Sequence, residues 1–445
     1  MFTVRPRTFP EGFIWGTATS GHQIEGNNTA SDWWAWESGK IRGGRTSGLA
    51  CDAWNRYEED YDIMASLGLN GYRMGIEWAR VQPSRGSGSS PDGGSTGWDD
   101  AAFARYEHML QALASRGIRV CLTLYHWTLP KWVADDGGWE NPATVDRFAA
   151  YVEQVVQRLG RYPHLWCTLN EPNVYTMSSY VAGEFPPEVR SFIRARRVMR
   201  NLWTAHAAAW QIINSAHTGP GKPLVGIAHN MMEIAPASQG LLDRKIAQFH
   251  SYAWNRSFID ALETGTMRGP FGDGKPIPGL AGSYSCLGVN YYLRRTVKFA
   301  LNGIADAFSQ EVIPEGTDVT DFGWPVVPEG LTYCLNQAAS LRVPIYIMEN
   351  GLSDARDALR PRFILEHLEA TARAMESGAD VRGYFHWSFQ DNFEWRDGYT
   401  QKFGLVELDP EHPEAPRRPR PSAQLYSAIA RANGITDEMI REWLC

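Results

Sequence analysis

Short apolar runs alternate along the chain with longer segments whose apolar positions recur every three to four residues. The runs have the length of buried strands, about four to eight residues, and the longer segments have the period of amphipathic helices. This alternation predicts repeated βα units around a parallel sheet. The eight expected strands are residues 13–17, 71–76, 118–124, 165–169, 224–228, 286–289, 344–348 and 381–386.

Three segments between these strands carry clear helix signals. Residues 99–115 have a consistent apolar face, and so do residues 142–159, where Asn141 can cap the helix and a proline suits its first position. The longest expected helix covers residues 188–216. Eight βα units without a break in composition predict an α/β fold, a single-domain (β/α)8 TIM barrel over residues 1–445, made larger than the usual ~250 residues by long βα loops.

Two stretches are expected to be loops. Residues 84–97 are rich in glycine and serine, like a linker, but the βα alternation continues on both sides of them. They are therefore interpreted as a surface loop after the second strand, and more readily as a tolerated insertion than as a lid. Residues 301–328 show neither period and are expected to form a long irregular loop.

The overall composition is that of a globular protein, with 43% hydrophobic and 21% charged residues. The 50 acidic residues outnumber the 43 basic ones, giving a net charge of −7, so nucleic acid is not an expected partner. No apolar leader and no stretch of membrane-spanning length is found, which predicts a cytoplasmic protein without a membrane partner. The oligomeric state is left open, with a homo-oligomer among the options.

The six cysteines are scattered and form no C-x-x-C pair. Several of them lie inside apolar runs, where small buried thiols are common. A disulfide framework or a cysteine metal site is therefore not expected. Neither a metal nor a cofactor is predicted.

Polar side chains gather where the expected strands end. In a TIM barrel the functional groups come from the carboxyl ends of the strands, so this convergence indicates one site assembled from distant parts of the chain. A buried histidine or asparagine alone is more often a satisfied core group. The strand-end residues are Arg73, Glu77, His126, Asn170, Glu171, Asn230, Asn290, Tyr292, Glu349 and Trp387.

Two of these residues, Glu171 and Glu349, are candidates for a working pair of carboxyl groups. Such a pair can cleave a glycosidic bond if one group is kept protonated and the other ionised. Arg73 and Tyr292 could donate hydrogen bonds to Glu349, which would be the ionised member, and Glu171 beside Asn170 would have the raised pKa. The alternative is a structural network in which the glutamates pair with arginines.

The supply of aromatic side chains also fits a sugar site. The chain has 18 tryptophans, and indole faces match the C–H faces of pyranose rings. Most single tryptophans are more readily core residues than platforms, but Trp324, Trp387 and Trp395 are surrounded by polar candidates.

Four motifs give the chain a resemblance to the glycoside hydrolase family 1 β-glycosidases over essentially its whole length. Residues 9–20 with 23–26 are similar to the N-terminal signature of that family, and residues 170–172 (Asn-Glu-Pro) to its acid/base motif. Residues 349–351 (Glu-Asn-Gly) resemble the nucleophile motif. Residues 391–395 with 403–405 resemble the late sugar-binding motif.

The resemblance implies a retaining double displacement in which Glu349 is the nucleophile and Glu171 the acid/base. The two carboxyl groups would then lie about 5–5.5 Å apart. Tyr292 and Arg73 would support the nucleophile, Trp387 would stack beneath the sugar and Trp324 would be the platform for the leaving group. The substrate-binding residues implied are Gln23, His126, Asn170, Asn290, Tyr292, Trp324, Trp387, Glu394, Trp395 and Phe403.

Single residues of this chain distinguish between branches of the family. Thioglucosidases of the plant type have glutamine in place of the acid/base, whereas Glu171 is intact. Glu394 stands where phospho-glycosidases have a serine, so an unphosphorylated sugar is expected. Glu77, where many members have serine, is expected to form a structural salt bridge, and Gln390 replaces a common apolar residue.

The expected function is a retaining β-glucosidase that acts on terminal non-reducing β-D-glucosyl residues of short oligosaccharides or of aryl and alkyl glucosides. Its expected partners are therefore small β-glycosides. A β-galactosidase, β-fucosidase, β-mannosidase or transglycosylating enzyme on the same scaffold remains an alternative. A non-catalytic carbohydrate-binding barrel is less favoured, because members of that type lack one of the two glutamates and this chain has both.

Overall fold

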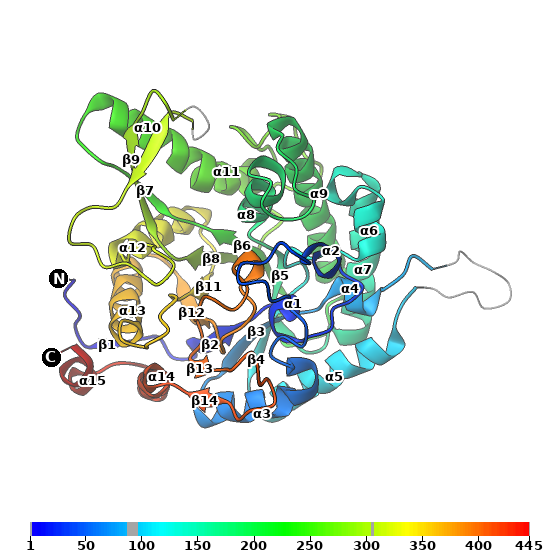
Figure 1. The fold of residues 1–445 in the computed structure, drawn as a ribbon, viewed down its shortest axis with the longest axis horizontal. Helices are drawn as coiled ribbons and strands as arrows, with labels where there is room; N and C mark the ends of the chain where they lie inside the picture. The colour runs from blue at the N-terminus through cyan, green and yellow to red at the C-terminus, as the bar shows by residue number, and fades with distance from the viewer. Residues whose placement is uncertain (1, 87–96, 304–306, 445) are drawn as a thin grey trace.

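The protein is described here by a computed structural model covering residues 2–86, 97–303 and 307–444. Eight parallel strands close into a barrel, and each lies where the sequence pattern predicts a strand (Figure 1). The order around the barrel is β11-β12-β2-β3-β4-β5-β6-β8. Their bounds are β2 Ile14–Ala18, β3 Gly71–Gly75, β4 Arg119–Thr123, β5 Pro163–Asn170, β6 Leu224–Asn230, β8 Leu287–Tyr291, β11 Ile345–Asn350 and β12 Val381–Trp387. The predicted (β/α)8 barrel is confirmed.

The strands are buried along nearly their whole length, because helices cover the outside and side chains fill the inside. Several run further than their apolar pattern indicates. β5 extends to Asn170, β6 to Asn230 and β11 to Asn350. About half of the polar strand-end residues are therefore part of the sheet, which holds their backbones rigidly, while Glu77, His126, Glu171 and Tyr292 lie just beyond it.

Helices follow the strands as expected for βα units. α5 is Asp100–Ser115, and Asp99 caps it by accepting a hydrogen bond from the Ala102 amide (2.9 Å). α7 is Ala143–Leu159, and Asn141 accepts from the Ala143 amide (3.0 Å), as predicted. The other helices that cover the barrel include α3 Ala53–Ser66, α11 Ser257–Thr264, α12 Pro328–Ala338, α13 Arg360–Glu376 and α14 Pro421–Ala432.

The helix predicted for residues 188–216 begins later than expected. α9 is Phe192–Ala216, and the Ser191 side chain caps it by accepting from the Arg194 amide. Glu188 has a left-handed backbone (φ 57°) directly after two prolines, so the chain cannot be helical there. The prediction was wrong for these first residues.

Residues 301–328 also differ from the expected irregular loop. They contain β10 Ser309–Val312, which pairs antiparallel with β9 Arg294–Phe299, and β9 in turn pairs with β7 Glu233–Pro236. Helix α10 Leu241–Ser251 packs against this small sheet, and the unit projects from the barrel rim (Figure 1). The strand was missed because Ser309–Val312 is short and three of its four residues are polar. Most of the predicted loop 84–97 lies outside the described residues.

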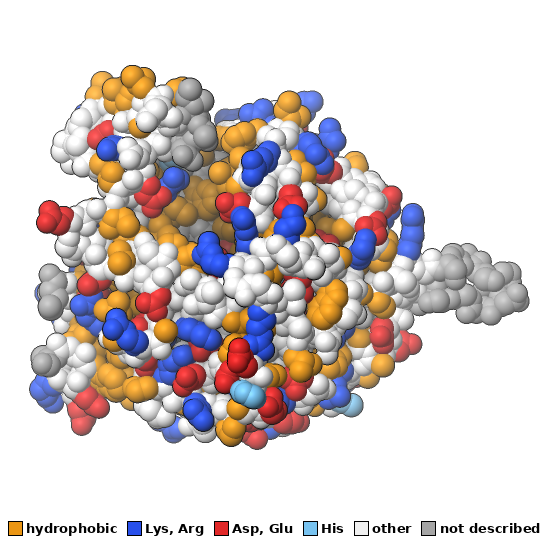
Figure 2. Space-filling model, viewed as in Figure 1, with side chains coloured by type: hydrophobic (Ala, Val, Ile, Leu, Met, Phe, Trp, Pro, Cys, Tyr) orange, Lys and Arg blue, Asp and Glu red, His pale blue; other side chains and the backbone are white. Residues whose placement is uncertain are grey.

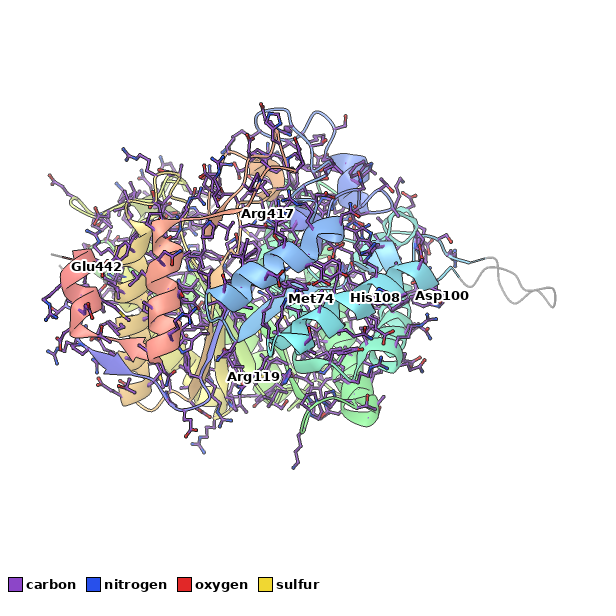
Figure 3. All side chains as sticks on the ribbon, turned by 90° about the horizontal axis from the view of Figure 1, so that it is seen from below. Met74, Asp100, His108, Arg119, Arg417 and Glu442 are labelled. Atoms are coloured by element: carbon purple, nitrogen blue, oxygen red, sulfur yellow. The ribbon has the colours of Figure 1, made fainter. Side chains whose placement is uncertain are left out.

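The lower face of the molecule carries helices α3 and α5 side by side, and α13 beside α14 (Figure 3). Arg417, in the segment before α14, reaches back to Asp60 of α3 (2.8 Å). Five cysteines are buried and unpaired, as expected, and the sixth lies outside the described residues. Within the described ranges, no helix is both long and apolar enough to cross a membrane.

Candidate active site

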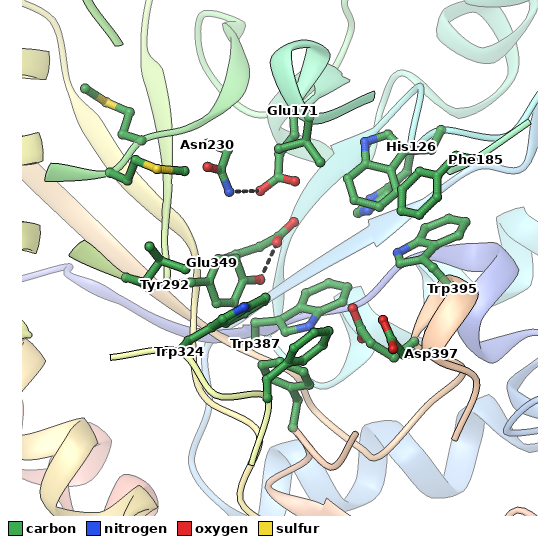
Figure 4. Close-up of a pocket in the computed structure, with 18 of the residues that line it drawn as sticks. His126, Glu171, Phe185, Asn230, Tyr292, Trp324, Glu349, Trp387, Trp395 and Asp397 are labelled. Atoms are coloured by element: carbon green, nitrogen blue, oxygen red, sulfur yellow. Dashed lines mark hydrogen bonds between the residues drawn. The ribbon is translucent and has the colours of Figure 1, made fainter. Parts of the chain in front are cut away.

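A cavity of about 250 Å³ opens at the carboxyl ends of the barrel strands. The face in Figure 2 is hollowed beneath the α10 unit, and hydrophobic side chains line the hollow. Both candidate glutamates face the cavity, one from each side (Figure 4). The predicted residues that line it are His126, Glu171, Asn230, Tyr292, Trp324, Glu349, Trp387, Glu394, Trp395 and Phe403.

Glu349 is held by two donors. Arg73 on β3 donates from Nη1 to Glu349 Oε1 (2.5 Å), and the Tyr292 hydroxyl donates to Oε2 (2.6 Å). Arg73 is fully buried, and its other nitrogens donate to Thr123 Oγ1 (3.0 Å) and Asn170 Oδ1 (2.6 Å). A charged donor and a phenol on opposite oxygens favour the ionised carboxylate and fix its orientation.

Glu171 directly follows β5 and has a left-handed backbone (φ 45°) that turns its side chain into the cavity. Its Oε1 accepts from two amides, Asn230 Nδ2 and Asn290 Nδ2, both at 2.9 Å. Trp254 Nε1 donates to Asn230 Oδ1 (3.2 Å) and so sets which way that amide lies. Because Oε1 is already an acceptor twice, a proton on Glu171 belongs on Oε2.

The two glutamates have different electrostatic surroundings. Burial and the nearby charge of Glu349 raise the pKa of Glu171 from its usual 4.5 to about 8. Burial also raises the pKa of Glu349, but Arg73 and Tyr292 oppose this rise. The first proton of the coupled pair therefore leaves Glu349, and Glu171 keeps its proton near neutral pH.

The polar end of the cavity is built from strand-end amides and a neutral imidazole. Asn170 Nδ2 donates to His126 Nε2 (3.0 Å), and burial beside Arg73 lowers the pKa of His126 well below its usual value. With Nε2 as acceptor, the hydrogen of the neutral ring is on Nδ1. Gln23 Nε2 donates to Glu394 Oε2 (3.3 Å) from the first βα loop.

Four carboxyl groups and no lysine or arginine line the cavity within the described part of the chain. Besides Glu171 and Glu349 these are Glu394 and Asp397. Burial and the charge of Asp397 raise the pKa of Glu394 to about 8. Arg42, which is mostly exposed, pairs with Asp397 at the rim. The cavity therefore suits a neutral ligand with many hydroxyl groups better than an anion.

Aromatic rings form the walls around these polar groups. Trp395 lies 4.8 Å from Trp127 and 5.9 Å from His126, centroid to centroid, while His126 is stacked with Trp387 at 6.0 Å. Phe185 contacts Trp127 (5.5 Å) from a different loop. Such flat surfaces can pack against the C–H faces of a sugar ring.

The opposite end of the cavity is apolar. Phe322 and Trp324 are stacked at 4.3 Å, and Met231, Met232 and Trp254 also line the cavity. Asn230, whose amide is already bonded to Glu171, is the polar group on this side. This end can take a hydrophobic group next to Glu171.

The remaining predicted residues lie behind the cavity lining and contact the residues that form it. Gln23, Arg73, Asn170 and Asn290 do not line it but bond to the glutamates or to His126. They hold the groups that face the ligand.

Several lining residues were not among the sequence candidates. Met231 and Met232 directly follow Asn230, so the end of β6 was a usable signal for them. Trp127 and Leu293 likewise follow the predicted His126 and Tyr292 directly. The others come from short helices, a π-helical turn and loops, and are Val174, Phe185, Trp254, Phe322 and Asp397.

Glu77 does not form the salt bridge expected for it. Its carboxylate accepts hydrogen bonds from neutral donors: the His22 amide, Asn28 Nδ2 and Thr128 Oγ1. Arg80, three residues on, pairs with Glu25 instead (2.9 Å). The described residues contain no cluster of three or more histidine, cysteine or acidic side chains that could hold a metal ion.

The raised pKa of Glu171 makes a prediction for stability. The folded protein binds this proton more tightly than the unfolded chain, so Glu171 costs stability increasingly as the pH rises from about 4.5 towards 8. The unfolding free energy of Glu171→Gln minus that of wild type should therefore increase over this pH range and then level off. Urea unfolding at a series of pH values measures it, and a difference that does not change with pH would contradict the assigned pKa.

Comparisons with known proteins agree with this geometry. The model of glycosyl hydrolase family 1 matches residues 5–435. A beta-galactosidase of Pyrococcus woesei is 31% identical over 98% of this chain and 99% of its own, and beta-glucosidase A of Thermotoga maritima is 31% identical over 97% and 99%. The solved beta-glycosidase from Pyrococcus horikoshii superposes with a TM-score of 0.89 at 38% identity, covering 99% of this chain and 98% of that one. The chain therefore belongs to glycosyl hydrolase family 1.

Proposed function

We propose that this glycoside hydrolase is a retaining β-glucosidase, with Glu349 as nucleophile and Glu171 as acid/base. The observation that carries the proposal is the unequal environment of the two carboxyl groups in one cavity. Glu349 is bonded to Arg73 and Tyr292, whereas Glu171 is bonded only to amides and its pKa is raised to about 8. Retention requires this division between an ionised nucleophile and a protonated acid.

In the first step Glu349 attacks the anomeric carbon as the bond to the leaving group breaks. The proton on Glu171 Oε2 goes to the departing oxygen, so the leaving group departs as a neutral alcohol. In the second step Glu171, now ionised, takes a proton from water, and the water oxygen displaces Glu349 from the sugar. The expected carboxyl separation of about 5–5.5 Å stays a prediction.

The lining of the cavity supports a neutral sugar and an apolar leaving group. Glu394, which Gln23 holds, and His126 offer acceptors and donors for hydroxyl groups, and the absence of lysine and arginine from the described lining disfavours a phosphorylated sugar. The apolar end, with Phe322 and Trp324, supports aryl or alkyl leaving groups in addition to sugars.

A β-galactosidase is the second candidate. It is favoured by similarity to the beta-galactosidase of Pyrococcus woesei, which is as identical to this chain as the beta-glucosidase A of Thermotoga maritima. The two activities share the glutamate pair and differ in how one hydroxyl group is held.

Removing the nucleophile tests the mechanism directly. Glu349→Gly should lower kcat on the order of 10⁴- to 10⁶-fold, because no covalent intermediate can form. Added azide should restore turnover of an activated aryl β-glucoside, since the small anion fits the space left by the carboxylate. Wild type should release product of retained configuration when followed by NMR. Normal activity of the variant, or an inverted first product, would exclude the assignment.

The role of Glu171 predicts a dependence on the leaving group. Glu171→Ala should lose about 10²- to 10⁴-fold with alkyl glucosides, whose leaving oxygens need a proton. With dinitrophenyl glucosides the first step should be much less affected, because that leaving group departs as an anion. Pre-steady-state measurement of glycosylation separates the two steps. Equal losses on both substrates would argue against the acid role.

The cavity lining predicts substrate preference. Wild type should have its highest kcat/KM on β-glucosides within a panel that also contains galactosides, fucosides and mannosides. Among alkyl β-glucosides, kcat/KM should rise by up to about fourfold for each methylene that enters the apolar end, from about 0.8 kcal/mol per buried CH₂. A higher value for galactosides would favour the second candidate, and a flat response to chain length would exclude the apolar leaving-group site.

A further inference from the structure

Glu77 occupies a central place among the barrel strands that carry the polar end of the site. It lies two residues after the end of β3, and β3 lies between β2 and β4 in the barrel. The loops after β2 and β4 carry Gln23 and His126, respectively. An acid at this position can therefore reach both loops at once.

The carboxylate of Glu77 makes contacts in both directions. Oε1 accepts from the His22 amide (3.0 Å), and Oε2 accepts from Asn28 Nδ2 (2.8 Å), both in the loop after β2. Oε2 also accepts from Thr128 Oγ1 (2.7 Å) in the loop after β4. Glu77 is only 3% exposed, so each lost acceptor would leave a buried donor without a partner.

A second contact pathway leads from Glu77 to the aromatic wall of the cavity. Asn28, which donates to Glu77, also lies 3.2 Å from His22 Nδ1. Burial lowers the pKa of His22 to about 3, so its ring is neutral and Nδ1 can accept. The His22 ring is stacked on Trp395 with an angle of 14° between the planes, and Trp395 lines the cavity.

The chain is locally shaped to receive this carboxylate. A Cβ atom on Gly21 would lie 2.6 Å from Glu77 Cγ and 2.8 Å from Oε1. Any larger residue at position 21 would push the side chain of Glu77 away from the amide it binds. Glycine thus allows the loop that carries Gln23 to pack directly on the acid.

We propose that Glu77 is a positioning residue for sugar binding, which clamps the loops after β2 and β4 so that His126, Trp395 and Glu394, the acid that Gln23 holds, surround the sugar. This inference rests on the proposed function, because it assumes that these three side chains bind the glycone. Glu77 itself does not line the cavity and touches no reacting group. It acts through the loops that it joins.

The proposal is tested by steady-state kinetics of wild type and Glu77→Gln with 4-nitrophenyl β-glucoside. The amide of glutamine has one acceptor oxygen instead of two, so at least one loop is released. We expect kcat/KM to fall on the order of 10²-fold, the effect of a small misplacement of binding groups. Thr128→Val, which removes one donor and keeps the acid, should give a smaller loss in the same direction.

Glu369→Gln is the matched control. Glu369 is also a buried carboxylate that joins distant segments, accepting from Arg7 (2.7 Å) and Arg373 (2.8 Å), neither of which lines the cavity. It should lower the melting temperature without changing kcat/KM. An equal kinetic loss in both variants would overturn the proposal, because general destabilisation would then explain the loss.

A double-mutant cycle with His126→Ala separates positioning from a merely structural role. If Glu77 acts through His126, then Glu77→Gln should cost much less in the His126→Ala background than in wild type. Additive losses in the two variants would overturn the proposal. It would also be overturned if wild type is active and Glu77→Gln has the same kcat/KM. Failure of the proposed function would instead appear as a wild type that hydrolyses no β-glycoside.

Discussion

The site depends on one buried cation, the guanidinium of Arg73. From β3 it donates to Thr123 on β4, Asn170 on β5 and Glu349 on β11. A guanidinium that is fully removed from water is costly unless acceptors surround it. Each of these strands therefore has to present an oxygen at the level of Arg73. Because the guanidinium is planar and its N–H groups point in fixed directions, it fixes the positions of β3, β4, β5 and β11 relative to one another.

The position of this single cation also decides which acid is ionised. Arg73 contacts Glu349 but not Glu171 or Glu394, and the pKa values of the latter two are raised to about 8. Burial would raise the pKa of all three acids alike if no cation were present. The difference between the proposed nucleophile and the proposed acid/base is thus an outcome of where one arginine lies.

Much of the barrel could be predicted from sequence, because buried parallel strands and amphipathic helices leave strong periodic signals. The strand ends could be predicted as well, and they included both glutamates and their support, Arg73 and Tyr292. What could not be predicted were contacts that depend on how loops fold over the rim. Trp254, in a π-helical turn, donates a hydrogen bond to Asn230, and no local sequence pattern predicts this contact.

Side-chain partners were harder still to predict than the places of the residues. A third acid near the rim suggested a salt bridge for Glu77, yet Arg80 pairs with Glu25, and Glu77 accepts from amide and hydroxyl donors instead. Which acid receives a cation depends on the packing of several elements at once. The strand β10 was missed for a similar reason, since its pairing with β9 rather than its own composition makes it a strand.

The two ends of the cavity arise from different parts of the fold. At the polar end, Asn170 and Asn290 come from strand termini, whose backbones are held in the barrel, while His126 and Glu394 lie in segments between strands. The apolar residues Phe322, Trp324 and Trp254 also lie between strands, and such segments can change with little effect on the barrel. The two ends are linked, however, because Trp254 orients Asn230 and Asn230 donates to Glu171. A change in the apolar wall that moved Trp254 would therefore also reorient Glu171, and under the proposed function this ties the choice of leaving group to the step that releases it.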